Sequence, residues 1–220
     1  MKLKILAIIP ARGGSKRLKN KNIKIFNKKP LIASTIEIAQ KSKFINEIYL
    51  TSDDNKILKI GKRYKIKTIK RPKKFSNDTI NVDVSLRHAY LKYKKKFDYI
   101  VTLQPTIPLR TIQDIDASIN KIINDKADSL LTVFKRHSFF WEKSGRYYRP
   151  INYSFKKRPR SQDVEHYQEN GAVYVTKPEI LINSYNRLGG KISIYIMNFW
   201  KSFDIDDIED FKYVEKLLKY

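Results

Sequence analysis

The sequence contains no cysteine. This absence excludes a disulfide framework and any metal site built from thiolates, and it agrees with a reducing compartment, so we expect a cytoplasmic protein. Long apolar runs are also missing. The apolar stretch Ile5–Ile9 is shorter than a signal-peptide core and leads directly into Pro10. We therefore interpret it as a buried first strand, and we expect no segment that spans a membrane.

Acidic residues are few beside the basic ones. The 220 residues include 46 lysines and arginines but only 22 aspartates and glutamates, which gives a formal net charge of +24. Such a charge fits a polyanionic partner such as nucleic acid. The lysines, however, are spread over the whole chain, and no motif interleaves aromatic and basic residues as nucleic-acid binders do. We therefore expect no nucleic-acid partner, but a surface that favours anionic ligands.

Apolar runs alternate with helical patterns along the chain, and no repeat or low-complexity linker interrupts them. The patterns predict strands at residues 3–9, 47–51, 67–70, 99–104, 129–134, 171–176 and 192–199. They predict helices at residues 31–40, 54–64, 82–93 and 208–218, and a further helix that Thr111 caps. This order is typical of a doubly wound, mainly parallel sheet with helices on both faces. We predict a single α/β domain over residues 1–220.

The alternating pattern breaks between Phe139 and Glu169. This stretch is rich in aromatic residues, among them Trp141, Tyr147 and Tyr148, which stand among many basic residues. It is too aromatic for a solvated linker. We interpret residues 139–169 as a small protruding excursion from the sheet, which either forms a lid over the site or packs on another subunit.

The segment Pro10–Asn22 follows the first predicted strand, at the edge where open α/β sheets bind ligands. Gly13 and Gly14 allow the backbone to approach a phosphate and to aim its N–H groups at the oxygens. Cationic side chains that can neutralise a triphosphate surround them, namely Arg12, Lys16 and Lys21. The spacing is that of neither a Walker A loop nor a dinucleotide fingerprint. An ordinary glycine turn with solvated lysines is the alternative, but the whole string after the first strand favours a nucleotide loop.

The segment Leu103–Arg110 contains two prolines that stiffen the backbone just past a predicted central strand. Gln104 can donate to and accept from a ligand edge, and Arg110 can hold an anion. The alternative is a rigid connection without ligand contact.

Two arginines in Arg158–Asp163 offer forked donors that fit a sugar carboxylate. The dipeptide Asn170-Gly171 stands at the entrance of a predicted strand and is typical of a turn that approaches a ligand. A basic surface loop followed by a plain turn is the alternative for this region.

Asp204 and Asp206 stand two residues apart, so in extended backbone their carboxylates point to one face. Such oxygen ligands suit a Mg²⁺ ion that also holds substrate phosphates. The alternative is that Asp206 or Asp207 caps the final helix. We interpret the Asp53-Asp54 pair as a helix cap rather than a chemical site. The three histidines show no metal-ligand spacing, and we assign them no metal.

These strings, in this order, closely resemble those of the acylneuraminate cytidylyltransferases, or CMP-sialic acid synthetases. That group includes relatives that act on legionaminate-like and pseudaminate-like sugar acids. Arg71-Pro72, Asp78-Thr79 and Asn170–Tyr174 match further strings of the family, and the resemblance covers nearly the whole chain. It implies a nucleotide-diphospho-sugar transferase-like fold and transfer of CMP from CTP to the anomeric hydroxyl of a nonulosonic acid, with release of pyrophosphate. It also implies a homodimer in which a protruding segment reaches the neighbour's site.

The resemblance further implies a role for individual residues. Those that would bind the nucleotide are Ala11, Arg12, Gly13, Gly14, Ser15, Asn22 and Arg71. Those that would contact the acidic sugar are Gln104, Arg160 and Asn170. Mg²⁺ would be held by Asp204 and Asp206. The expected catalytic residues are Lys16, Lys21 and Asp206.

Two departures from the family bear on the substrate. An Arg-Pro pair precedes the Asn-Gly of the sialate enzymes, whereas Gln168-Glu169 stands here, and Ile80–Val82 replaces a hydroxyl-rich run. The loss of a positive charge near the expected sugar site favours a differently decorated nonulosonic acid over N-acetylneuraminate. Two alternatives are a cytidylyltransferase for the eight-carbon 3-deoxy-octulosonate and a basic nucleic-acid-binding protein.

Overall fold

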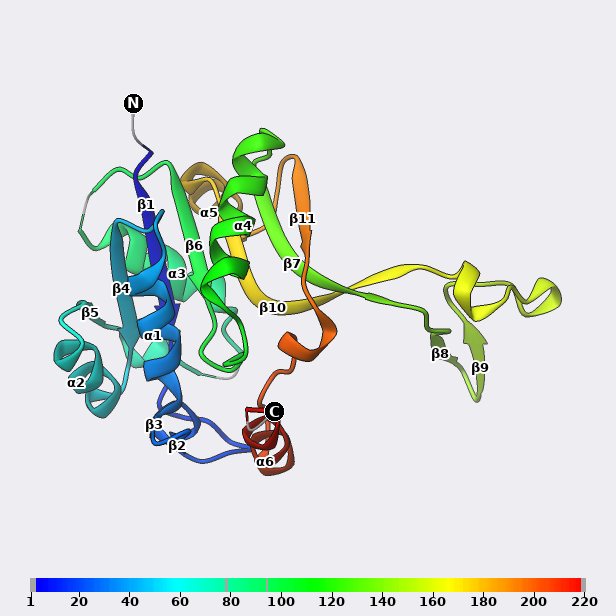
Figure 1. Ribbon diagram of the computed structural model, residues 1–220, viewed down its shortest axis with the longest axis horizontal. Helices are drawn as coiled ribbons and strands as arrows, with labels where there is room; N and C mark the ends of the chain where they lie inside the picture. Colours follow the sequence, from blue (N-terminus) through cyan, green and yellow to red (C-terminus); the bar gives the residue numbers. More distant parts are fainter. Residues whose placement is uncertain (1–2, 78, 94, 219–220) are drawn as a thin grey trace.

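A mixed β-sheet with β1 near its middle organises the molecule. The computed structural model describes residues 3–77, 79–93 and 95–218, so Asp78 of the matched Asp78-Thr79 string lies outside the described residues. Within them, the largest sheet has seven strands in the order β11-β7-β10-β6-β1-β4-β5 (Figure 1). These strands are β1 (Ile5–Pro10), β4 (Glu47–Ser52), β5 (Lys67–Lys70), β6 (Tyr99–Leu103), β7 (Ser129–Arg136), β10 (His166–Thr176) and β11 (Ile192–Ile196). β10 runs antiparallel to both its neighbours and the other pairs are parallel, which confirms the predicted fold class.

Helices cover both faces of this sheet. Along β1, Ile5, Ala7 and Ile9 face one hydrophobic core, and Leu6 and Ile8 face the other, because successive side chains of a strand point to opposite faces. The first core packs against α1 (Leu31–Lys41), α2 (Asn55–Arg63) and α4 (Ile112–Asn124), and the second against α3 (Val82–Leu91) and α5 (Pro178–Ser184). Burial on both faces explains why β1 is an unbroken apolar run.

Helix α6 (Ile208–Leu217) packs apart from these layers, against the loop that follows β1 (Figure 1). Its Phe211 and Val214 join a small third core with Leu18 and Ile205. Asp207 begins the helix with a capping box, since its side chain accepts from the Asp210 N–H. The cap is therefore Asp207, and Asp206 stays available for the site.

Short elements complete the fold. Two small hairpins, which the sequence patterns did not predict, are formed by β2 (Ile25–Phe26) with β3 (Lys29–Pro30) and by β8 (Trp141–Ser144) with β9 (Tyr147–Pro150). Helix α5 was not predicted either. The predicted cap of α4 is confirmed, because the side chains of Thr111 and Asp114 form a capping box. Among the described residues no helix combines the length and apolarity that a membrane crossing requires.

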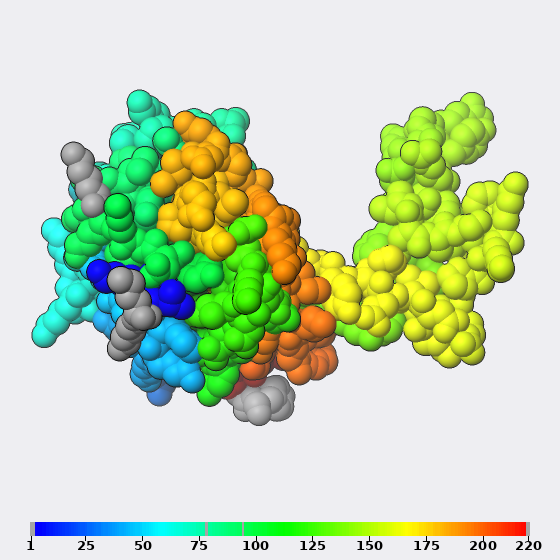
Figure 2. All heavy atoms as spheres, turned by 90° about the horizontal axis from the view of Figure 1, so that it is seen from above, coloured from blue at the N-terminus to red at the C-terminus, as the bar shows by residue number. Residues whose placement is uncertain are grey.

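The predicted excursion is an arm, residues 137–165, that projects far from the body of the molecule (Figures 1 and 2). The ends of β7 and β10 form its base, where Arg136 pairs with His166 and Phe134 with Gln168. A bulge between Glu169 and Tyr174, with Gly171 at φ 70°, separates this base from the regular sheet. Within one chain the arm points away from the body, so it does not form a lid over it.

Gly61 lies in the interior of α2, where a β-carbon would stand 2.6 Å from Leu50 Cδ2 and 2.8 Å from Thr68 Cγ2. Alanine is a better helix former by about 1 kcal/mol, but the steric overlap costs roughly 1–3 kcal/mol. We therefore expect Gly61→Ala to lower the free energy of unfolding, measured in urea, by about 1 kcal/mol. The exposed control on the same helix, Lys62→Ala, should change it by less than about 0.5 kcal/mol. A stabilised Gly61→Ala protein would contradict the close approach.

Candidate active site

A cleft of about 610 Å³ opens at the carboxyl ends of β1, β5 and β6. Its walls come from the loop after β1, the segment after β5, the start of α3, the segment after β6 and the turn before α6. Lys16 and Asp206, which stand far apart in the sequence, line the same cleft. Parallel strands bring their carboxyl ends to one edge of a sheet, and this edge is where α/β folds bind ligands.

The glycine loop begins as a continuation of β1, because the Ala11 N–H donates to the Thr51 carbonyl at 3.0 Å. The next contact turns the loop, since the Gly13 N–H donates to Asp53 Oδ1 at 3.0 Å. A β-carbon at Gly13 would lie 2.7 Å from Asp54 Cβ, so the position requires glycine, whereas one at Gly14 would meet nothing within 4 Å. The loop is thus packed tightly at Gly13 and open at Gly14.

Asp53 also connects the loop to Arg71, whose guanidinium lies 3.9 Å from the same carboxylate. Arg71 is buried, and its Nε donates to Ser76 Oγ at 2.9 Å. Burial lowers the pKa of Arg71, as does the charge of Arg12, while Asp53 raises it. The result is a fixed cation in the wall of the cleft that an anionic ligand would stabilise.

Asn22 is buried beside this cluster. Its amide nitrogen donates to the Arg12 carbonyl at 2.9 Å, which holds the loop closed. Its Oδ1 has no hydrogen-bond partner among the described residues, although the side chain lines the cleft. A buried acceptor of this kind is costly unless a ligand or water donates to it.

The segment Asp204–Asp206 is held on both sides by backbone contacts. The Ile205 N–H donates to the Thr106 carbonyl at 2.8 Å, and Lys21 Nζ donates to the Ile205 carbonyl at 2.6 Å. Lys21 also lies 3.1 Å from Asp206 Oδ1, and Arg17 lies 2.8 Å from Asp206 Oδ2. The glycine loop and the turn before α6 therefore form one structural unit.

Asp204 is an exposed residue that lines the second pocket described below, but neighbouring protein atoms still desolvate its carboxylate. This partial desolvation raises its pKa, a hydrogen bond with Thr106 lowers it, and the charge of Asp206 raises it. Among the described residues no group of three or more histidine, cysteine or acidic side chains surrounds a common point. A cation held here would therefore depend on two carboxylates and on oxygens of a substrate, which is the usual situation of Mg²⁺.

A second pocket of about 520 Å³ adjoins the cleft, and Gln104 lines both. Asp204 stands in its wall at the side of the cleft. The rings that line it are those of Phe134, Phe199, Phe203 and Tyr174, and its charged side chains are those of Arg136, Glu169 and Asp204. The Tyr174 hydroxyl donates to Glu169, and burial raises the pKa of Tyr174 to about 12, so it remains a donor at neutral pH. The pocket has the size and mixed polarity of a small-molecule site.

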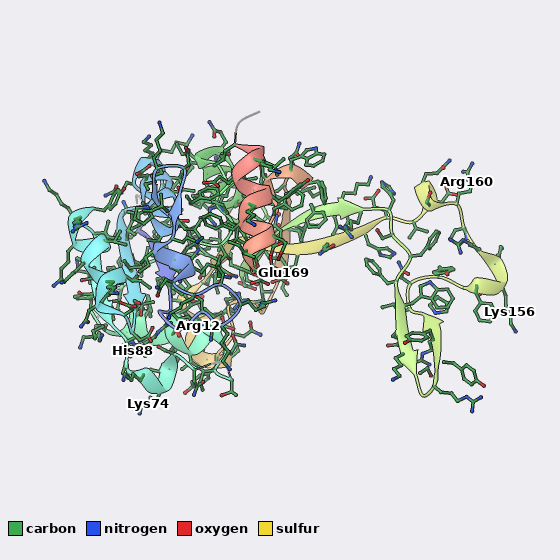
Figure 3. All side chains as sticks on the ribbon, turned by 90° about the horizontal axis from the view of Figure 1, so that it is seen from below. Arg12, Lys74, His88, Lys156, Arg160 and Glu169 are labelled. Atoms are coloured by element: carbon green, nitrogen blue, oxygen red, sulfur yellow. The ribbon has the colours of Figure 1, made fainter. Side chains whose placement is uncertain are left out.

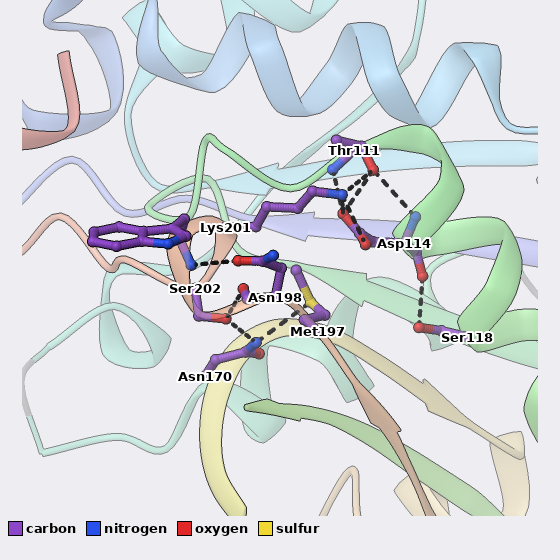
Figure 4. A network of polar contacts seen from close by, with 9 residues as sticks. Thr111, Asp114, Ser118, Asn170, Met197, Asn198, Lys201 and Ser202 are labelled. Atoms are coloured by element: carbon purple, nitrogen blue, oxygen red, sulfur yellow. Dashed lines mark hydrogen bonds and ion pairs between the residues drawn. The ribbon is translucent and has the colours of Figure 1, made fainter. Parts of the chain in front are cut away.

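A polar network fixes the wall of this second pocket (Figure 4). The Asn170 amide nitrogen donates to Ser202 Oγ at 2.9 Å, and Ser202 donates to the Asn198 carbonyl at 3.1 Å. On the other side of the turn, Lys201 lies 3.3 Å from Asp114 at the start of α4. These contacts hold the turn that leads into Asp204.

A family model described as cytidylyltransferase matches residues 6–220 of this chain. The chain belongs to the cytidylyltransferase family. Curated relatives include the post-translational flagellin modification protein B of Campylobacter coli, 31% identical over 98% of this chain and 95% of its own length. The pseudaminic acid cytidylyltransferase of Campylobacter jejuni is 30% identical over 99% of this chain and 97% of its own. The N-acylneuraminate cytidylyltransferase of Escherichia coli is 31% identical over 96% of this chain but only 51% of its own length.

Solved structures support the same fold. A CMP:2-keto-3-deoxy-manno-octonic acid synthetase complexed with CTP has a TM-score of 0.74 at 17% identity, with 98% of each chain covered. A 4-diphosphocytidyl-2C-methyl-D-erythritol synthase of Anaerococcus prevotii has a TM-score of 0.73 at 14% identity, with 100% of each chain covered. At such identities the likeness is one of fold.

Most predicted site residues of this cytidylyltransferase meet at one place. Those that line the cleft itself are Arg12, Ser15, Lys16, Lys21, Asn22, Arg71, Gln104 and Asp206. Ala11, Gly13 and Gly14 belong to the same loop but do not line the cleft, and Ala11 is buried. Asp204 lies at the junction with the second pocket.

Three predicted or candidate residues have other surroundings. Arg160 lies at the far end of the arm, where it pairs with Asp163 at 2.8 Å and stands far from Arg12 (Figure 3). Asn170 lines the second pocket, but its amide group is occupied by protein partners, including Thr132 Oγ1 at 2.6 Å. Arg110 is buried and donates to the Gln104 and Ala172 carbonyls and to Thr35. Arg110 is therefore a structural residue rather than an anion binder, whereas Gln104 of the same segment lines the cleft, so ligand contact by this segment stays a prediction.

Sequence reasoning missed three residues that the fold brings to this site, and it noted a fourth, Glu169, only as a departure from the family near the expected sugar site. Asp53, interpreted as a helix cap, instead joins the glycine loop to Arg71, while Asp54 caps α2. Arg17 pairs with Asp206. Its position as a further cation in the loop was the sequence signal that could have identified it. Arg136 and Glu169 face the second pocket from the base of the arm. Their positions depend on the pairing of β7 with β10, which no local pattern reveals.

The two carboxylates of this cytidylyltransferase should affect stability in opposite directions. The folded state raises the pKa of Asp204, so it disfavours the charged form. In metal-free buffer at pH 7, Asp204→Asn should therefore raise the melting temperature. This gain should shrink as the pH falls through the folded pKa and vanish below the unfolded value of about 3.9.

The matched variant, Asp206→Asn, loses its ion pairs with Arg17 and Lys21. It should lower the free energy of unfolding by up to about 1 kcal/mol at pH 7. A stabilising Asp206→Asn, or an Asp204→Asn gain that is the same at pH 4 and pH 7, would contradict the electrostatic description.

Proposed function

We propose that this cytidylyltransferase transfers CMP from CTP to the anomeric hydroxyl of a nonulosonic acid and releases pyrophosphate. The observation that carries the proposal is the pair of adjoining pockets that share Gln104. The first is lined by the cations of the glycine loop, and the second combines aromatic rings with charged groups. Asp204 and Asp206 stand where the two pockets meet, which is where a phosphorus atom and an attacking hydroxyl must come together.

The first cleft suits a nucleoside triphosphate. The side chains of Arg12, Lys16 and Arg71 line the cleft and provide donors and positive charge for the phosphates. Asn22 offers an unpaired acceptor in the same wall, which an amino or hydroxyl donor of the nucleoside can satisfy. Lys21 donates to the Ile205 carbonyl and to Asp206, and these contacts keep the loop in place.

The second pocket suits an acidic sugar with several substituents. Two curated relatives named above are named for pseudaminic acid and N-acylneuraminate, both nine-carbon sugar acids. The Gln168-Glu169 pair lines the pocket, so the base of the arm contributes a neutral and an acidic side chain there. This supports a differently decorated nonulosonic acid rather than N-acetylneuraminate itself. The eight-carbon alternative is supported less, because the likeness to its synthetase is at the level of the fold.

The reaction consists of one in-line displacement. The anomeric hydroxyl oxygen bonds to the α-phosphorus of CTP, the bond from that phosphorus to the pyrophosphate oxygen breaks, and the hydroxyl proton passes to solvent water. Phosphoryl-type transfer needs positioning and charge neutralisation more than covalent participation. Gln104 orients the sugar against the nucleotide, and Lys16 stabilises the departing pyrophosphate. CTP is a cytoplasmic metabolite, so we expect the reaction to take place in the cytoplasm.

Asp204 and Asp206 would hold Mg²⁺. The fit rests on two observations: the carboxylates are close enough for the charge of Asp206 to raise the pKa of Asp204, and substrate oxygens can fill the remaining positions. When bound, the ion supplies positive charge that neutralises the phosphates and polarises the phosphorus. Arg17 and Lys21 form ion pairs with Asp206 and hold its carboxylate in position.

We further propose that two copies associate through the arm. The arm exposes Trp141, Tyr147, Tyr148 and Phe155, each with more than half of its surface accessible. Such a concentration of aromatic surface is typical of an interface. A second copy is also the route by which Arg160 can reach a sugar, because its own body is out of reach (Figure 3).

A pyrophosphate-release screen tests the proposed reaction. Each of the four nucleoside triphosphates is combined with several nonulosonic acids and with 3-deoxy-octulosonate, with and without Mg²⁺. We expect release only with CTP, a nonulosonic acid and Mg²⁺ together. Asp206→Ala should lower kcat by at least about 100-fold, because it removes charge at the reacting phosphate.

The control for this variant is Glu179→Ala, an exposed acidic residue at the start of α5 that lies outside both pockets. It should retain full turnover. If only 3-deoxy-octulosonate is turned over, the substrate is the eight-carbon sugar acid and not a nonulosonic acid. If Asp206→Ala retains full activity, the carboxylates take no part in the reaction.

Arg12 and Lys19 form a matched pair for the nucleotide loop, because both are cations of the same loop and only Arg12 lines the cleft. Arg12→Ala should raise the KM for CTP by about 10-fold or more, as expected for the loss of a charged hydrogen bond. The KM for the sugar should change little. Lys19→Ala should leave both constants within about twofold, since solvated charges contribute little. Equal effects of the two variants would assign the loop a general electrostatic role.

A further inference from the structure

Arg136 is the cation of the second pocket, and the reaction so far gives it no role. It is the last residue of β7, at the base of the arm, and it lines the same pocket as Gln104 and Asp204. The side chain is half-buried. It pairs in register with His166, and Phe134 lies two residues before it on the same face of the ribbon.

Two aromatic rings hold the guanidinium of Arg136 in place. Its central carbon lies 5.4 Å from the centroid of Phe134 and 5.9 Å from that of Phe199, and the two rings pack edge to face at 5.3 Å. These distances are within the range of cation–π contacts. Rings restrict the orientation of a guanidinium but leave its N–H donors free for a planar anion.

The acidic residues of the pocket do not use these donors. Glu169 accepts a hydrogen bond from the Tyr174 hydroxyl, and Asp204 interacts with Thr106. Among the described residues Arg136 forms no ion pair. By contrast, the adjacent Lys135 pairs with Glu165, and Arg160 of the arm pairs with Asp163 in two hydrogen bonds. Arg136 is therefore a preorganised cation that lines the pocket and has no ion-pair partner among the described residues.

We propose that Arg136 binds the carboxylate of the sugar acid. The inference rests on the proposed function, since it assigns a group of that substrate to a group of the second pocket. A forked guanidinium fits two carboxylate oxygens, and the aromatic walls strengthen the contact by excluding water. The carboxylate-binding arginine is thus supplied by the strand that enters the arm, within the same chain, rather than by Arg160 near its end.

The test compares a nonulosonic acid with its methyl ester, which adds one methyl group to the carboxylate and removes its negative charge. The ratio of kcat/KM for acid over ester is measured for the wild type and for Arg136→Met, which keeps an unbranched side chain over the rings. The wild type should prefer the acid by about 10- to 100-fold, the effect of a charged hydrogen bond. In Arg136→Met the preference should fall to within about threefold, because kcat/KM should fall for the acid and stay unchanged for the ester. Arg136→Lys should restore part of the preference.

Lys135→Met is the matched control, because Lys135 is the preceding residue, is exposed and lies outside both pockets. It should keep the wild-type preference. The KM for CTP should remain within about twofold in every variant, as a check that the nucleotide cleft is intact.

Three outcomes would overturn the assignment. An equal loss on acid and ester in Arg136→Met would make Arg136 a support for the rings. An unchanged preference in that variant would also remove it from recognition. A preference that collapses in Arg160→Met but persists in Arg136→Met would transfer the role to the arm of a second copy. If the wild type releases no pyrophosphate with any sugar acid, the proposed function itself fails, which these variants do not decide.

Discussion

The ammonium group of Lys21 connects two segments that are far apart in the chain and on which the site depends. It contacts the Ile205 carbonyl and Asp206, and so attaches the loop after the first strand to the turn before the last helix. The contact is reinforced by apolar packing, since Leu18 of the loop and Ile205 of the turn share a core with Phe211. Without this closure the cations of the loop and the carboxylates of the turn would belong to independent, flexible segments, and no ligand could meet both in a fixed geometry.

Features encoded by local chemistry were predictable from the sequence. The central strands were recognisable because burial on both faces leaves apolar runs such as Ile5–Ile9, and β5 matches its predicted bounds of residues 67–70. The nucleotide loop was recognisable because glycine and cations follow a strand directly. Helix α4 was recognisable by its cap, Thr111, and by the helical spacing of its isoleucines. Each of these signals lies within a few residues of the feature that it specifies.

Features that depend on pairing between distant segments were not predictable. The role of Asp53 follows from the approach of the loop to β4, and that of Arg136 from the register of β7 against β10. Arg110 shows the converse error, because an arginine after a strand looks like an anion binder until the fold buries it against carbonyl oxygens. Arg160 lies in the stretch that the sequence predicted to protrude, but local patterns could not show how far this arm would carry it from its own body (Figure 3).

The single reversed strand of the sheet has a geometric effect on assembly. Because β10 runs opposite to β6 and β7, it begins at the edge where they end, so the chain that joins β7 to β10 must leave and return at that edge. The arm therefore emerges beside the two pockets and nowhere else on the body. Any protein that binds the arm near its base therefore lies next to the two pockets. A substitution at the base of the arm can then affect both association and turnover.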